Sequence, residues 1–130
     1  MKKVPVTGAG GFIGHHLTKF LVKRGYWVRG VDVKLAEYEA TAAHELELLD
    51  LRRWDNCLTT ATRGVKEVYA LAANMAGIGF IHSHKAEVSR DNVLVNIHTL
   101  EAARVNGIAR LARSYEWIRG ELIKAGRVAE

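Results

Sequence analysis

The hydrophobic and polar positions along the chain change period several times, and these changes predict strands that alternate with helices. Short apolar runs bounded by turn residues indicate buried strands, whereas apolar residues every three to four positions indicate amphipathic helices. The predicted strands are 3–7, 27–33, 45–49, 67–72 and a short fifth at 108–112. The predicted helices are 11–24, 52–62, 85–106 and 115–124.

This alternation predicts an α/β fold of the Rossmann type. Right-handed crossovers place the helices on both faces of a parallel sheet. The expected strand order is 3-2-1-4-5, with a ligand at the switch point between strands one and four. Pro5 is expected to weaken the central first strand, because proline donates no hydrogen bond to a ladder. We expect residues 1–112 to form this domain, truncated after the fifth strand, and residues 113–130 to form a C-terminal amphipathic helix.

The turn after the first predicted strand is rich in glycine. Residues 6–14 read Val-Thr-Gly-Ala-Gly-Gly-Phe-Ile-Gly and lead into the first helix. Gly8 permits a sharp turn, Gly11 lets backbone amides approach a pyrophosphate, and Gly14 lets the helix pack closely on the strand. The helix N-terminus adds unpaired N–H groups and a partial positive charge. The order of strand, glycines and helix therefore predicts a dinucleotide-binding site.

An acid ends the second predicted strand, about 20 residues after the glycines. Asp32 stands where a carboxylate can accept hydrogen bonds from the adenosine ribose hydroxyls. A carboxylate there repels a 2′-phosphate, so we predict NAD rather than NADP, although Arg29 and Lys34 nearby weaken that preference. The alternative is that the glycines are ordinary turn residues and Asp32 is a surface acid.

Composition narrows the remaining functional classes. The chain has 130 residues, a net charge of +5 and one cysteine, and its 19 Lys and Arg residues form no single basic block. We therefore expect one domain at most and no nucleic-acid role. The chain lacks a membrane-length apolar stretch and a signal-peptide pattern, and Cys57 has no disulfide partner, so we expect a cytoplasmic protein away from membranes. His15-His16 and His82-x-His84 lack the convergent ligands of a zinc site, so no metal is expected.

Several segments resemble the extended short-chain dehydrogenase/reductase superfamily, in its nucleotide-sugar epimerase/dehydratase branch. The glycine motif and Leu-Glu-Ala-Ala at 100–103 are similar to the whole superfamily, and the stretch 75–81 resembles the GDP-mannose 3,5-epimerases. The resemblance covers residues 1 to about 110, through the segments 6–14, 29–32, 49–52, 68–81, 91–93 and 100–108.

The resemblance implies NAD as cofactor, a nucleotide-sugar such as GDP-mannose as a further ligand, and a homodimer formed through the long helix. It implies that Asp32 binds the adenosine ribose, that Asp50 and Leu51 flank the adenine, and that Ala72 and Ala73 line the path to the nicotinamide ribose. The implied cofactor-binding residues are Gly8, Gly11, Phe12, Ile13, Gly14, Asp32, Asp50, Leu51, Ala72, Ala73 and Asn92.

Three of these assignments have simpler alternatives. The resemblance places Gly77 and Gly79 in a loop that meets the nucleotide-sugar, but two glycines are also typical of a flexible turn. It matches Asn92 to a helix asparagine that supports the active site, but Asn92 could equally be a solvated helix residue. Asp50 could cap a helix and bind adenine at once.

The chain departs from the superfamily in its catalytic residues. That chemistry uses a Tyr-x-x-x-Lys pair, in which a tyrosinate is the base and the lysine lowers its pKa, whereas here Arg119 stands four residues after Tyr115. The branch also needs a cysteine after the fifth strand, and Cys57 lies far upstream. Residues 114–123 resemble the family's last helix, so we expect the catalytic segment and substrate domain to be missing after Leu111.

Three interpretations of function remain open at this point. The first is an NAD-binding domain of epimerase descent that is catalytically incomplete. The second is a working enzyme whose base comes from another chain. The third is a non-enzymatic module that senses NAD or binds a protein partner.

Overall fold

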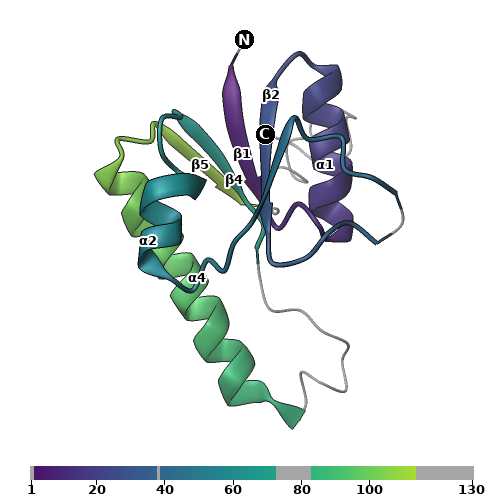
Figure 1. Cartoon of the computed structure of the whole chain (residues 1–130). Coiled ribbons are helices and arrows are strands. Elements are labelled where there is room, and N and C mark those ends of the chain that lie inside the picture. Colours follow the sequence, from purple (N-terminus) through teal and green to yellow (C-terminus); the bar gives the residue numbers. More distant parts are fainter. Residues whose placement is uncertain (1, 38, 73–82, 114–130) are drawn as a thin grey trace, which may run out of the picture.

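The computed structural model describes residues 2–37, 39–72 and 83–113 of the chain. Parallel strands form one sheet in the order β3-β2-β1-β4-β5, as Figure 1 shows. The strands are β1 (Lys3–Thr7), β2 (Trp27–Asp32), β3 (Glu45–Leu48), β4 (Glu67–Ala70) and β5 (Arg110–Arg113). The predicted Rossmann-type order is therefore confirmed, and the switch point lies between β1 and β4.

Helices cover both faces of the sheet. The helix α1 (Phe12–Lys23) lies on one face, while α2 (Trp54–Asn56), the turn η1 (Cys57–Ala61) and α4 (Lys85–Val105) lie on the other (Figure 1). The N-terminal half of α4 projects past the carboxyl edge of the sheet. The predicted helix at 115–124 lies outside the described residues.

The region predicted as one helix at 52–62 differs from that expectation. It starts at Trp54, and its second half is wound more widely than an α-helix. Thr62 donates both its amide (3.2 Å) and its hydroxyl (2.9 Å) to the carbonyl of Cys57, five residues earlier. The threonine hydroxyl thus competes for a helix carbonyl and stabilises the wide turn.

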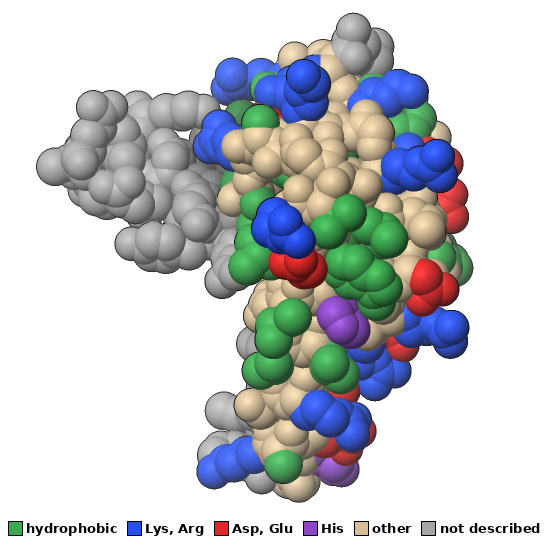
Figure 2. Space-filling view, turned by 90° about the vertical axis from the view of Figure 1, so that its left-hand side faces the viewer, with side chains coloured by type: hydrophobic (Ala, Val, Ile, Leu, Met, Phe, Trp, Pro, Cys, Tyr) green, Lys and Arg blue, Asp and Glu red, His purple; other side chains and the backbone are tan. Residues whose placement is uncertain are grey.

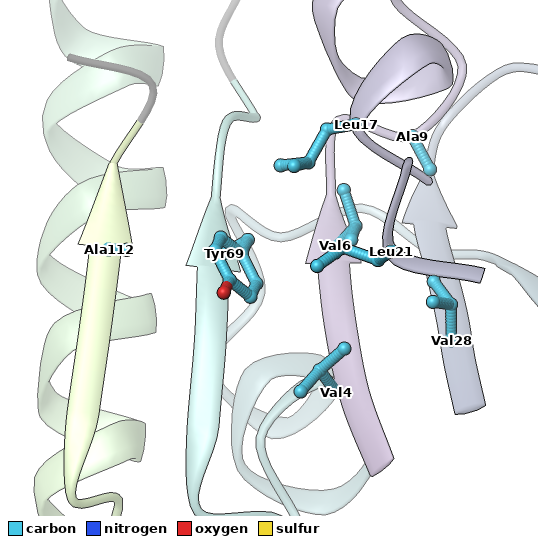
Figure 3. Packing of buried hydrophobic residues seen from close by; sticks show 8 residues of the cluster. All are labelled: Val4, Val6, Ala9, Leu17, Leu21, Val28, Tyr69 and Ala112. Atoms are coloured by element: carbon cyan, nitrogen blue, oxygen red, sulfur yellow. The ribbon is translucent and has the colours of Figure 1, made fainter. Parts of the chain in front are cut away.

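The core has two layers, one on each side of the central strands. On the α1 side, Leu17 and Leu21 pack over β1 and β2, where Val4, Val6 and Val28 are buried (Figure 3). On the α4 side, the buried cluster consists of Val31, Leu51, Cys57, Ala61 and Ala102. The central strands are covered on both faces, which explains why they appear in the sequence as nearly continuous apolar runs.

Pro5 lies inside β1, and its position explains how a proline is tolerated there. Pairing of β1 with β2 runs along the whole strand and includes Pro5 opposite Arg29. Pairing of β1 with β4 begins only at Val6, which lies opposite Tyr69. The ladder on the β4 side is therefore short where β1 lacks an N–H group, as the sequence predicted.

Candidate functional site

Two glycines of the loop after β1 are required by packing against neighbouring backbone. Gly8 has φ +75°, and a Cβ atom there would lie 2.8 Å from the carbonyl carbon of Leu71. A Cβ atom on Gly14 would lie 2.0 Å from the carbonyl oxygen of Gly8. Any side chain at either position would clash with main-chain atoms. The sequence interpretation of Gly8 as a turn residue and Gly14 as a packing residue agrees with this geometry.

Gly11 is different, because the protein itself leaves room beside it. The nearest atom to a Cβ on Gly11 would be 3.4 Å away, an ordinary contact, and its φ of −83° suits any residue. Gly11 is the N-cap of α1, and no side chain caps that helix end. Phe12 is 71% exposed and Ile13 is also exposed. The first turn of α1 therefore presents N–H groups and a partial positive charge to an open space, a geometry that suits an anion.

Asp32 and Gly10 join the end of β2 to the glycine loop. The carboxylate of Asp32 accepts the amide N–H of Gly10 at 2.8 Å through Oδ2 and that of Val33 at 2.6 Å through Oδ1. A Cβ atom on Gly10 would lie 2.3 Å from the carbonyl oxygen of Lys34. Each carboxylate oxygen keeps a further lone pair, so Asp32 can still accept hydroxyl groups. Gly10 was missed as a site residue, and only its place between two predicted glycines pointed to it.

Asp50 is held by an arginine two residues along the chain. Its carboxylate accepts the amide of Arg52 at 2.9 Å and the guanidinium at 2.7 Å, and these hydrogen bonds hold the pKa of Asp50 below its usual value. The N-cap of α2 is Arg53, so Asp50 shapes the turn before that helix instead of capping it. The same guanidinium reaches the buried Asp91 of α4 at 3.3 Å. The loop after β3 is thereby tied to α4.

The side chain of Leu51 is 3% exposed and belongs to the core on the α4 side. Its carbonyl oxygen accepts a hydrogen bond from the thiol of the buried Cys57 at 3.2 Å, which anchors the loop after β3 to the core. Asn92 lies in the second turn of α4 and is half-buried. Of the remaining predicted site residues, Ala73, Gly77 and Gly79 lie outside the described residues.

Thr7 organises the switch point between β1 and β4, and sequence reasoning missed it. Its buried hydroxyl oxygen accepts the amides of Leu71 at 3.1 Å and Ala72 at 3.2 Å. These bonds hold the chain leaving β4 against Gly8, so Ala72 lies beside the glycine loop. The signal in the sequence was a polar residue directly before the first glycine, following the apolar residues Val4, Pro5 and Val6.

A pocket of about 340 Å³ opens between the glycine loop and the segment after β2. Acidic, basic and aromatic side chains line it together with glycine backbone. The lining residues are Gly10, Gly11, Phe12, His15, His16, Lys34, Ala36, Glu37 and Glu39. This volume is the size of a small-ligand site, and Gly10 connects it to the carboxylate of Asp32.

Ion pairs close one side of this pocket. Glu39 accepts hydrogen bonds from Lys19 at 2.5 Å and from His15 at 2.7 Å, and these partners lower its pKa to about 2. Lys34 donates to Glu37 at 2.9 Å. The Nδ1 atom of His15 is buried and has no hydrogen-bond partner within the described part of the chain. His15 therefore links α1 to the segment after β2 through a single hydrogen bond, made by its Nε2 atom.

The described ranges contain neither a metal-binding cluster nor a membrane-spanning helix. Within residues 2–37, 39–72 and 83–113, no three His, Cys, Asp or Glu side chains come together in a way that could hold a metal ion. In the same ranges, none of the helices combines the length and apolar character needed to cross a bilayer.

Comparison with known proteins places this geometry in a family. Residues 4–114 match the NAD dependent epimerase/dehydratase family. The chain belongs to this family. The GDP-mannose 3,5-epimerase 1 of Oryza sativa subsp. japonica is 43% identical over 110 residues, a match that covers 83% of this chain and 29% of that protein. The chain thus spans less than a third of the length of the curated relative it matches.

Solved structures of the family have the same fold. A UDP-galactose 4-epimerase superposes with a TM-score of 0.72 and 30% identity, covering 85% of this chain and 37% of the other. MoeE5 in complex with UDP-glucose and NAD superposes with a TM-score of 0.71 and 29% identity, covering 85% and 35%.

Proposed function

We propose that this chain binds NAD along the carboxyl edge of its sheet, with the pyrophosphate over the N-terminus of α1. The observation that carries this proposal is Gly11. Packing within the protein explains Gly8 and Gly14, but nothing within the described structure requires a glycine at position 11. A pyrophosphate that approaches the backbone there would require one. The NAD bound to MoeE5, a structure of the same fold, supports this cofactor.

The adenosine half of NAD would lie between Asp32 and the loop after β3. Asp32 already orders the glycine loop through Gly10 and retains lone pairs for the two ribose hydroxyls. Asp50 would accept the adenine amino group at the edge of its Arg52 pair, and the backbone at Leu51 would flank the ring. The nicotinamide half would pass Gly8 and Ala72, with Ala73 and Asn92 on the same path.

For the second ligand we propose a nucleotide-sugar of the GDP-mannose type. The support is the 43% identity to a rice GDP-mannose 3,5-epimerase. Gly77 and Gly79 would meet this ligand. The sequence has no Tyr-x-x-x-Lys pair, so the chain alone lacks a base of the kind the family uses. We therefore propose an NAD-binding domain that is catalytically incomplete by itself and works in the cytoplasm, where the buried free thiol of Cys57 stays reduced.

An exposed apolar stripe on α4 favours a second candidate function, protein association. Val93, Ile97 and Leu100 recur at helical spacing, and Ile97 is 56% exposed. Figure 2 shows hydrophobic side chains at the surface over this helix. The buried positions of α4 are Val88, Asp91, Thr99, Ala102 and Ala103, so this stripe does not face the sheet. A homodimer through α4, or a module that pairs with another protein, would cover it.

Two measurements test the proposed function. Calorimetric titration of the purified chain with NAD should show one site, and Gly11→Ala should weaken it while the circular dichroism spectrum stays the same. Incubation with GDP-mannose and NAD should give no epimerised sugar, with the full-length rice relative as positive control. Absence of NAD binding by the folded chain would contradict the proposed NAD site. Sugar turnover above that of a heat-treated blank would contradict the proposal that the chain alone is catalytically incomplete.

A further inference from the structure

The pocket beside Asp32 contains more basic side chains than an NAD site needs. Lys34, His15 and His16 line it, and Lys19 reaches its edge through Glu39. Gly10 belongs to the lining, and its amide is bound by the Asp32 carboxylate. A ribose held by Asp32 would therefore direct its 2′-position toward this pocket. Lysine and histidine side chains at such a place are the groups that bind a phosphate.

Two glutamates form hydrogen bonds with these basic side chains. Glu39 binds Lys19 and His15 at the same carboxylate oxygen, at 2.5 Å and 2.7 Å. Glu37 binds Lys34 at 2.9 Å. Both glutamates also line the pocket, so a phosphate entering it would meet two carboxylates in addition to Asp32. The low pKa of Glu39 keeps its carboxylate charged throughout the neutral range.

We infer that Glu39, together with Glu37, is a specificity-determining residue that excludes the 2′-phosphate of NADP by binding the basic side chains at this pocket. The inference rests on the proposed binding of NAD and adds to it a second source of discrimination besides Asp32. The physical reason is that selectivity is a difference of two affinities, which a site can enlarge by repelling the wrong ligand. Here the repulsive carboxylates also remove the attraction that the lysines would otherwise supply.

Variants of Glu39 and Lys19 test whether the carboxylate of Glu39 prevents Lys19 from binding a phosphate. In Glu39→Gln the carboxylate is lost, and the ammonium of Lys19 becomes available to a phosphate. In Glu39→Gln/Lys19→Gln the carboxylate is also lost, but the freed cation is absent. Glu101→Gln is the matched control, because Glu101 is an exposed acid paired with Arg104 on α4, on the opposite face of the sheet from α1. It changes the net charge equally without touching the pocket.

The experiment is calorimetric titration of each variant with NAD and with NADP at low salt and at about 0.5 M salt, where the screening length is only a few ångströms. We expect Glu39→Gln to raise NADP affinity relative to NAD about three- to tenfold, as one freed charge-assisted contact in a solvated pocket would do. In Glu39→Gln/Lys19→Gln, the logarithm of the NADP-to-NAD affinity ratio should rise by less than half as much as in Glu39→Gln. Glu37→Gln should act in the same direction, and high salt should reduce every gain.

The outcomes separate the two proposals. If the wild-type chain binds NAD and the NADP-to-NAD ratio is the same in Glu39→Gln as in Glu101→Gln, the inference about Glu39 is wrong and the NAD site stands. If the folded wild-type chain binds neither dinucleotide, the proposed function fails and the inference fails with it. Because Glu39 and Lys19 form a solvent-exposed pair, their replacement should leave the fold intact, which the circular dichroism spectrum checks.

Discussion

The Oδ2 atom of Asp32 accepts the amide of Gly10 at 2.8 Å, so the carboxylate that ends β2 also holds the loop that follows β1. The residue predicted to bind the ribose is therefore already fixed by a main-chain donor from the predicted phosphate site. Preorganisation of this kind reduces the ordering that a ligand would otherwise have to bring about. Substitutions at Asp32 should therefore affect both the predicted ribose contact and the glycine loop.

Two variants of Asp32 distinguish the effect of its negative charge from the effect of its hydrogen bond to the glycine loop. Asp32→Asn keeps an oxygen for the Gly10 amide but removes the negative charge, whereas Asp32→Ala removes both. We expect both variants to narrow the preference for NAD over NADP, because like-charge contact at such a site costs on the order of 1–3 kcal/mol. Asp32→Ala should also weaken NAD itself more than Asp32→Asn does. Calorimetry measures both effects, and equal wild-type affinity for the two cofactors would contradict the assignment.

Gly11 and Gly14 form a matched pair for testing the glycine loop. An alanine at Gly14 would place its Cβ 2.0 Å from the oxygen of Gly8, so we expect it to cost about 1–3 kcal/mol of folding stability or more. An alanine at Gly11 meets only an ordinary 3.4 Å contact, so the melting temperature should change little. NAD affinity should fall in both variants. A Gly11→Ala chain that binds NAD as tightly as wild type would show that the pyrophosphate does not approach this backbone.

The α4 stripe predicts self-association that one charge can abolish. In wild type we expect a dimer at micromolar concentration, since two-fold dimers are the commonest assembly and the stripe is apolar. Ile97→Lys should shift sedimentation to a 14.4 kDa monomer without loss of helix content. Leu48→Lys, an equally exposed apolar position on the edge strand β3, is the control. Dissociation by Leu48→Lys alone would assign association to the sheet edge instead.

Glu67 predicts a loss of stability in acid. Burial opposes ionisation of this carboxylate, which is 5% exposed, but hydrogen bonds from Lys2 and Tyr69 outweigh that effect and hold its pKa below the usual 4.5. Because the folded-state pKa is depressed, the stabilisation is present above pH 4.5 and is lost as the pH falls through the folded value.

The matched variant for this effect is Glu67→Gln, which keeps the shape and an acceptor for the Tyr69 hydroxyl. We expect it to lower stability by about 1–2 kcal/mol at pH 7, as the loss of a charge-assisted hydrogen bond would. Chemical denaturation of both chains from pH 7 to pH 3 should show the difference shrinking as Glu67 of the wild type becomes protonated. A difference that stays constant over this range would mean that the charge of Glu67 contributes nothing.

The sequence determined the elements and their order. Apolar runs such as Val4–Val6 and Trp27–Val31 indicate buried strands. The glycines followed by Asp32 indicate a strand, turn, helix and strand in succession. Both patterns can be recognised because their residues lie close together in the chain. The family likeness of 75–81 also lies in a continuous stretch. Within the described residues, the limits of the helices and strands differed from the predicted ones by at most two residues, and the wide turn at η1 was not predicted.

Only the tertiary structure decided which side chains meet across the site. The Asp32–Gly10 bond joins residues 22 apart, His15–Glu39 joins residues 24 apart, and Thr7 reaches Leu71 across 64 residues. No periodic pattern encodes such contacts, because they depend on how the carboxyl ends of separate strands converge in a parallel sheet. For the same reason the sequence alone did not reveal that Glu39, an acid in a polar stretch, binds both Lys19 and His15 of α1.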